Sequence, residues 1–145
     1  MKISTKGRYA IRLMLDLAIN NTGEYISLKD ISNRQEISIK YLEQIVILLT
    51  RSGLLKSIRG AQGGYQLVRD PDEYKIGEIL RIAEGGLAPI ACLENNPNTC
   101  PRVDRCATIK FWIGLSDVIN DYVDSFTLED LVEEYRSKQE IEYFI

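Results

Sequence analysis

The chain has 145 residues, of which 45% are hydrophobic and 27% charged, as in a soluble globular protein with one core or one small domain plus a dimerisation appendage. This length leaves no room for a second, independent enzyme domain, and no apolar stretch approaches the roughly 20 residues needed to span a bilayer. The first residues lack the apolar segment of a signal peptide, so we expect a cytoplasmic protein.

The net charge of −3 hides a strong asymmetry between the two halves. Residues 1–69 contain 11 Lys or Arg and 5 Asp or Glu, whereas residues 70–145 contain 7 and 16, so the halves carry +6 and −9. A basic half attracts phosphates, and an acidic half is repelled by them. The first half is therefore expected to face a nucleic acid and the second half to face away from it.

Three helices are expected in the first 53 residues. Thr5 can cap a helix that extends to about residue 20, and Ser27, which with Asp30 resembles a capping box, begins a shorter helix ending near residue 35. Ser38 can cap a third helix, which Gly53 ends. The second and third helices are joined by a short turn at Glu36 and Ile37, so together they are a candidate helix-turn-helix.

A hairpin and a fourth helix are expected next. Two strand-like runs at 54–58 and 65–68 flank the segment RGAQGG at 59–64, which predicts a hairpin with a glycine-rich tip. A helix-turn-helix followed by a hairpin is the order of a winged-helix domain. Apolar residues from Ile76 to Ala83 then predict a helix that stops at the glycine pair 85–86.

The third helix would place its N-terminal turn in the major groove of DNA. Ser38 and Lys40 can then meet phosphate, and Gln44 can form two hydrogen bonds with an adenine. Tyr41 can contact a phosphate or a thymine methyl, or it can belong to the core. Arg51 is a further candidate for a phosphate contact, or a surface residue with no role.

The hairpin would bring a second set of residues to DNA. Arg59 can enter the minor groove, and Gly60, Gly63 and Gly64 permit close approach, although a solvated turn is the alternative. Lys6 can contact phosphate or serve no role. The predicted DNA-binding residues are Lys6, Ser38, Lys40, Tyr41, Gln44, Arg51, Arg59, Gly60, Gly63 and Gly64.

Three cysteines lie in or beside a proline-containing loop that precedes a long amphipathic helix. Cys92, Cys100 and Cys106 have the spacing C-x7-C-x5-C, and thiolates gathered in this way suit a soft metal or an iron–sulfur cluster; three unrelated buried thiols are the alternative. The following helix carries an apolar stripe against which something must pack. The stripe consists of Ile109, Trp112, Ile113, Ser116, Ile119, Tyr122, Val123 and Phe126.

Three segments resemble the Rrf2 family of winged-helix transcription regulators, which includes IscR, NsrR, RirA and CymR. They are STKGRYA at 4–10, ISIKYLEQ at 37–44 and IRGAQGGY at 58–65, and the likeness is strongest to IscR-type iron–sulfur regulators. The resemblance implies a homodimer that binds promoter DNA, packs through the long helix and holds a cluster, most simply 2Fe-2S, with Cys92, Cys100 and Cys106.

The sequence departs from the family pattern at the fourth cluster ligand. Some members have a histidine three residues after the last cysteine, where this chain has Ile109, and others have an acid or histidine where it has Arg8. The chain contains no histidine. Glu94, Asp104, Glu43 or an exogenous ligand remain candidates.

These features predict a mainly α protein with a small β-hairpin wing. Residues 1–85 would form the winged helix-turn-helix domain, 86–108 the cysteine-containing sensor loop, and 109–145 the dimerisation helix and a C-terminal helix. The predicted function is a transcription regulator, a repressor, that senses cluster status, iron or redox or nitrosative stress. The alternatives are a metal-free, CymR-like regulator controlled by a small molecule or partner protein, and a zinc-binding or protein-interaction module. An enzyme is not expected, because acid–base and phosphate-binding signatures are missing.

Overall fold

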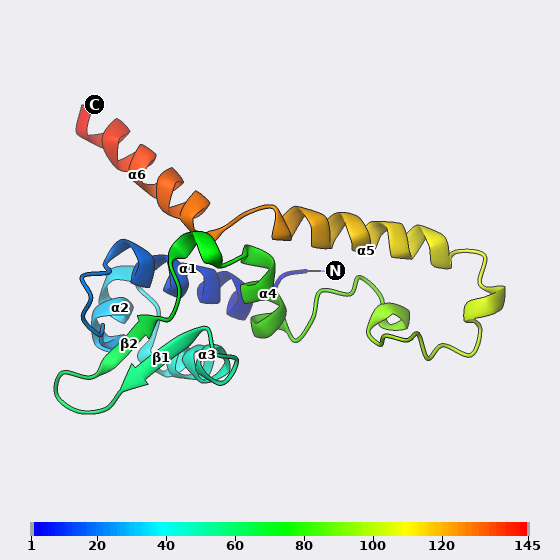
Figure 1. Ribbon diagram of the computed structural model, residues 1–145, viewed down its shortest axis with the longest axis horizontal. Helices are drawn as coiled ribbons and strands as arrows, with labels where there is room; N and C mark the ends of the chain where they lie inside the picture. The colour runs from blue at the N-terminus through cyan, green and yellow to red at the C-terminus, as the bar shows by residue number, and fades with distance from the viewer. Residues whose placement is uncertain (1, 145) are drawn as a thin grey trace.

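The computed structural model describes residues 2–144. The first residue of the predicted domain 1–85 and the last residue of the predicted segment 109–145 therefore lie outside the described residues. The described chain is mainly α-helical with one small hairpin, as predicted. Figure 1 shows a body formed by α1 to α4 and the hairpin, from which α5 and α6 extend in different directions. The loop that contains the cysteines lies at the far end of α5 from the body.

The first three helices form where the sequence pattern places them. The side chain of Ser27 accepts a hydrogen bond from the Asp30 amide at 3.2 Å, which confirms the predicted cap. The first helix, however, is capped by Ser4 and not by Thr5, and Ser4 is held by two hydrogen bonds to Glu84, of 2.9 and 2.7 Å. The bounds are Thr5–Ile19 for α1, Leu28–Gln35 for α2 and Ile39–Arg51 for α3.

The predicted wing is an antiparallel hairpin of β1 (Leu55–Ile58) and β2 (Gly64–Leu67). Its second strand also pairs with the connection between α1 and α2, where Ile26 and Tyr65 exchange two backbone hydrogen bonds of 2.9 and 2.8 Å. The wing is therefore attached on one side to its own strand partner and on the other to the helix-turn-helix.

One buried tyrosine joins the base of the wing to the body. Tyr74 is 0% exposed, and its hydroxyl donates to the Leu54 carbonyl at 2.7 Å. The same oxygen accepts from the amides of Val68 at 2.9 Å and Arg69 at 3.1 Å. Three backbone groups that leave the regular strand pattern are thus satisfied by a single side chain.

The fourth helix completes the body. After a short 3-10 turn, η1 (Pro71–Glu73), α4 spans Ile76–Glu84 and ends at Gly85, whose φ of 78° is the left-handed conformation expected there. Apolar side chains of α1, α3 and α4 form one core with contributions from the wing. Its largest fully buried members are Tyr74, Leu13, Met14, Leu17, Ile31, Leu42, Ile45, Leu49, Leu54, Ile79, Leu128 and Val46.

The last two helices are α5 (Ile109–Asp124) and α6 (Leu128–Phe144). A complete capping box begins α6, since the Thr127 amide donates to Asp130 at 2.8 Å and the Asp130 amide donates to the Thr127 hydroxyl at 3.2 Å. The start of α6 is anchored by the buried Leu128 and Val132. No helix among the described residues is both long and apolar enough to cross a membrane.

The apolar surface of α5 divides into two faces, which the single predicted stripe did not anticipate. Ile119 and Val123 pack against the core of the body. Other large apolar side chains point away from it, and no residue of α5 is buried. These exposed residues are Phe111, Leu115, Val118 and Tyr122, with Phe126 just beyond the helix. Ile113 is also exposed, but it lines a cavity together with Leu93 and Asn95 of the cysteine loop.

Candidate DNA-binding surface and cysteine loop

The third helix presents a polar face to solvent. Its N-cap, Ser38, accepts a hydrogen bond from the Tyr41 amide at 3.2 Å. Lys40, Gln44 and Arg51 are exposed, and their spacings of four and seven residues align them along one side of α3. The structure thus brings together these predicted phosphate and base contacts on one continuous surface.

Tyr41 lies at the edge of this surface and not at its centre. It is half-buried and meets Tyr9 of α1 edge-on, with ring centroids 5.4 Å apart. This contact is the core-packing role that the sequence left open. A contact between the Tyr41 hydroxyl and DNA stays a prediction.

The three glycines of the wing differ in what requires them. Gly60, with φ of 115°, has open space around it, next to the exposed Arg59. A Cβ at Gly64 would lie 2.2 Å from the Ile26 carbonyl oxygen, and one at Gly63 would lie 2.4 Å from a carbonyl oxygen of the hairpin itself. Gly63 and Gly64 are therefore needed for packing within this chain, whatever their role at DNA.

One further predicted DNA-binding residue lies on the first helix. Lys6 is half-buried in the first turn of α1. It makes no hydrogen bond or ion pair with α3 or the wing among the described residues. Its contact with phosphate stays a prediction.

A buried carboxylate that the sequence analysis missed holds α2 against α1. Asp16 is 1% exposed. Its carboxylate accepts hydrogen bonds from the Arg34 guanidinium at 3.0 and 2.7 Å and from the side-chain amide of Gln35 at 3.0 Å. The hydrogen bond to Asp16 raises the pKa of Arg34. The sequence feature that could have indicated this contact is the position of Asp16, an acid within the apolar face of the first predicted helix.

The cysteines lie in the irregular segment between α4 and α5, which contains the short turns η2 (Ala91–Leu93) and η3 (Val103–Arg105). All three are free thiols; Cys92 is exposed, and Cys100 and Cys106 are partly exposed. They are accordingly not the buried thiols of the alternative interpretation.

The surroundings of two thiols differ in a way that affects ionisation. Local desolvation, then the nearby thiols of Cys100 and Cys106, raises the pKa of Cys92. The pKa of Cys106 is lowered, first by a hydrogen bond with the Thr108 hydroxyl, whose oxygen lies 3.4 Å from Sγ, and then by backbone amides at the start of α5. Cys106 is therefore the thiol whose surroundings favour the thiolate, the form that binds metal.

The three thiols do not form a compact single-ion site. Among the described residues, the only group of three or more candidate ligands whose ligand atoms all lie within 4.8 Å of one another is the exposed set Asp70, Asp72 and Glu73. Zn–S bonds of about 2.3 Å would place the sulfur atoms of one tetrahedral ion about 3.8 Å apart. At least one pair of the loop sulfurs is farther apart than 4.8 Å, whereas Cys100 is near enough to Cys92 to raise its pKa.

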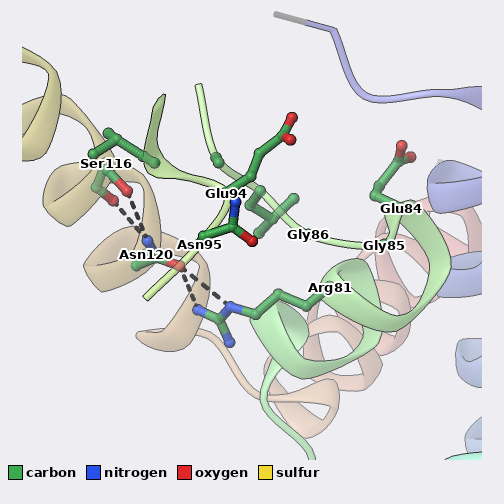
Figure 2. A pocket seen from close by; sticks show the side chains of 11 residues that line it. Arg81, Glu84, Gly85, Gly86, Glu94, Asn95, Ser116 and Asn120 are labelled. Carbon is green, nitrogen blue, oxygen red and sulfur yellow. Dashed lines mark hydrogen bonds between the residues drawn. The ribbon is translucent and has the colours of Figure 1, made fainter. Parts of the chain in front are cut away.

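A polar cavity of about 590 Å³ connects the cysteine loop with α4 and α5 (Figure 2). On its floor Arg81 of α4 reaches α5, with hydrogen bonds to Asn120 at 2.8 Å and to Asp124 at 2.7 Å. Glu94 and Asn95 of the loop form the facing wall. The sequence analysis missed this contact, for which the only signal was two polar residues four apart on α5.

The α4–α5 junction is tight as well as charged. A Cβ at Gly77 of α4 would lie 2.1 Å from the Asp124 carboxylate and 2.8 Å from the Val123 side chain. The Arg81 guanidinium lowers the pKa of Asp124, by hydrogen bonding first and by charge second, with desolvation opposing it. The long helix is thus held to the body through a small number of specific contacts.

A helix-turn-helix, a hairpin wing and a protruding helix define a class of small DNA-binding winged-helix proteins. This chain belongs to the Rrf2 family, whose model, described as iron-dependent transcriptional regulator, matches residues 3–134. It is accordingly a transcription regulator of that family and not an enzyme.

Relatives of two kinds are similar to almost the whole chain. The HTH-type transcriptional regulator CymR of Bacillus subtilis is 41% identical over 144 residues, 99% of each chain. The solved structure of CymR, the global cysteine regulator of B. subtilis, matches with a TM-score of 0.73 over 92% of this chain and 98% of that chain. The structure of T. potens IscR matches with a TM-score of 0.74 at 37% identity, over 96% of this chain and 91% of that chain.

Proposed function

We propose that this chain is a cytoplasmic homodimeric repressor that binds promoter DNA through α3 and the wing and senses an iron–sulfur cluster bound by Cys92, Cys100 and Cys106. The observation that carries the proposal is three free, solvent-accessible thiols in one irregular segment that leads directly into α5. The signal would be cluster supply, iron, or redox or nitrosative stress.

The donor set fits a cluster with more than one iron. Thiolates are the usual ligands of iron–sulfur clusters, and a 2Fe-2S cluster distributes its ligands over two irons. The lowered pKa of Cys106 favours its thiolate, the form that binds metal. When bound, the cluster would supply a centre that reacts with oxidants or is lost when iron is scarce.

The positions of the acidic residues reduce the number of candidates for the fourth cluster ligand. Glu43 is an exposed residue of α3, and α3 lies on the body, away from the cysteine loop of the same chain (Figure 1). Glu94 and Asp104 are exposed carboxylates within the loop. We therefore assign the fourth position to one of these two or to an exogenous ligand, each of which would leave the cluster more labile than four thiolates.

A change in the loop would reach DNA through the long helix. The loop enters α5, and Arg81 joins α5 to α4, which packs on α1 and α3. The exposed apolar face of α5, centred on Val118, would meet the same face of a second copy. A shift of α5, caused by a change in the loop, would then alter the distance between the recognition helices of the two copies.

The proposal is tested by purifying the protein without oxygen and measuring visible absorption, iron and acid-labile sulfide per chain. We expect coloured protein with both elements, and loss of colour after serine replaces Cys92, Cys100 or Cys106. Thr99→Ala, beside Cys100, is the matched control. It removes a 3.3 Å hydrogen bond from the Asn95 side chain but no thiol, and should leave the colour unchanged. Colourless protein after anaerobic reconstitution would replace the proposal with a metal-free regulator.

The DNA part of the proposal has its own readout. Holo and apo protein are titrated with duplexes selected by the protein from a random pool, at several salt concentrations. Arg59→Ala should weaken binding to all duplexes and reduce the slope of log K against log salt by about 1. Arg136→Ala, an exposed arginine on α6, is the control. Equal affinity of holo and apo protein for every duplex would exclude sensing through DNA affinity.

A further inference from the structure

We propose that Ile47 contacts the C5-methyl group of a thymine in the major groove and so selects thymine at one position in each half of the operator. The inference rests on the proposed DNA-binding function and adds to it a specificity-determining residue. Ile47 was not among the residues predicted from sequence. It draws attention because 48% of its surface is exposed in the middle of α3.

Ile47 occupies the side of α3 opposite to the core. The buried residues of this helix are Leu42, Ile45, Val46 and Leu49. With 3.6 residues per turn, position 47 projects about 150° away from their mean direction. The neighbours of Ile47 on that side are Lys40, Glu43, Gln44 and Arg51, all exposed, so that two cations and one acid lie beside it.

The exposure of Ile47 differs in kind from that of the other exposed aliphatic residue of α3. Ile39, 42% exposed, lies in the first turn on the same side as Leu42 and Val46, so that the end of the helix accounts for its exposure. Ile47 has two helical turns on one side of it and one on the other. It is a branched apolar side chain inside a stripe of polar and cationic ones.

The charges around Ile47 indicate what covers it. Lys40 and Arg51 flank it along the helix, and both complement the phosphates on either side of a DNA groove. The thymine methyl is the apolar group that base pairs present in the major groove, and apolar side chains recognise it by contact. Duplex DNA therefore satisfies both the cations and the isoleucine, whereas an apolar protein surface would leave the cations unpaired.

The position relative to Gln44 restricts where the thymine lies. Gln44 and Ile47 are three residues apart, which corresponds to about 4.5 Å along the helix axis. This distance is close to the 3.4 Å between adjacent base pairs. If Gln44 bonds an adenine, Ile47 meets a methyl in the same base pair or in the next one. The selected operators should therefore contain, in each half, either one A·T pair that both side chains contact or two adjacent A·T pairs.

The test uses uracil, which differs from thymine in DNA only by the missing methyl group. Operators are first selected by wild-type protein from a random duplex pool, and each thymine is then replaced by uracil in turn. Affinity is measured by fluorescence anisotropy at one salt concentration for wild type, Ile47→Ala and Val68→Ala. Val68 is a comparably exposed aliphatic residue, 42%, at the base of the wing, and provides the matched control.

We expect one thymine per half-site at which uracil weakens wild-type binding about fourfold, the equivalent of one apolar methyl contact. Ile47→Ala should bind the thymine and uracil operators equally, and Val68→Ala should behave as wild type. Circular dichroism should show equal helix content in all three proteins, because alanine is a good helix former.

Two results would overturn the inference while leaving DNA binding intact. Either uracil is tolerated at every position by the wild type, or the uracil effect persists unchanged in Ile47→Ala; in both cases Ile47 is an isolated surface residue. Failure of the wild type to select any sequence from the pool would instead overturn the proposed function, and with it this inference.

Discussion

The body of the protein and its long helix α5 differ in how far their apolar side chains are buried. In the body, the residues that face inward on α1, α3 and α4 are almost completely covered by the same chain. On α5, which is longer than any helix of the body, no residue is buried. The body can therefore fold on its own interactions, whereas α5 needs a second surface to complete it.

This difference matches the two tasks that we assign to the regions. A DNA-reading surface requires fixed geometry, and the buried Asp16 and Tyr74 networks provide it. A sensing region must respond to a small chemical change, and a lightly packed segment does so at low energetic cost. The cysteine segment is exposed along much of its length and begins next to the α4–α5 junction.

The largest effect is expected from a charge on the exposed face of α5. Val118→Glu should raise the dimer dissociation constant on the order of 1000-fold, because the substitution occurs on both sides of a twofold interface. Analytical ultracentrifugation measures this change, and the melting of the body should stay the same. Ile141→Glu, at another exposed aliphatic residue on α6, is the control. If both variants remain dimeric, α5 is not the dimerisation helix.

A smaller effect, confined to the body, is expected from Tyr74→Phe. Loss of the hydroxyl leaves the Leu54 carbonyl and the Val68 and Arg69 amides without this partner, in a site that is closed to water. We expect a loss of about 2–3 kcal/mol in the free energy of unfolding. Urea denaturation provides the measurement, with Tyr135→Phe on α6 as the exposed control. A change below about 0.5 kcal/mol in Tyr74→Phe would show that these groups find other partners.

The smallest effect is expected at the contact that joins the two regions. Arg81 lowers the pKa of Asp124 below its ordinary 3.8, so the contact stabilises the folded chain above that pH and the stabilisation is lost as pH falls through the lowered value. Asp124→Asn should destabilise by less than about 1 kcal/mol at pH 7, since both side chains are about one-third exposed.

The pH dependence distinguishes this contact from general destabilisation. The difference in unfolding free energy between wild type and Asp124→Asn should be constant from pH 5 to 7 and shrink below pH 3.8. Asp117→Asn, at an exposed position on the same helix, should show no such difference. A gap between wild type and Asp124→Asn that does not change with pH would contradict an ionic contact.

Local rules were sufficient for most of the body. Ser27 and Ser38 cap the helices they were expected to cap, and Gly85 ends α4. The cap of α1 was misplaced by one residue because Ser4 and Thr5 are adjacent and both residue types cap helices. The choice depends on Glu84, which is 80 residues away in the chain and could not be anticipated from local sequence.

Periodicity was less informative where two surfaces share one helix. The apolar residues of α5 were identified, but their pattern does not show that Ile119 and Val123 face the body while Val118 faces away. The wing glycines present a similar problem, since the close approach that Gly64 permits is to Ile26 within the chain. The polar contact of Arg81 with α5 depends on the packing of α4 and was invisible to motif analysis.

The pairing of Ile26 with Tyr65 has a consequence for how any regulator built on this fold can work. Because the wing shares backbone hydrogen bonds with the connection between α1 and α2, it cannot swing independently of the recognition helix. Each reading head is a single rigid piece with a fixed footprint. In a dimer, a change at α5 would then alter only the separation and relative rotation of the two DNA-binding domains. Besides the bases read within each half, operators would therefore differ in their response through the length of DNA between the halves, counted in base pairs of 3.4 Å.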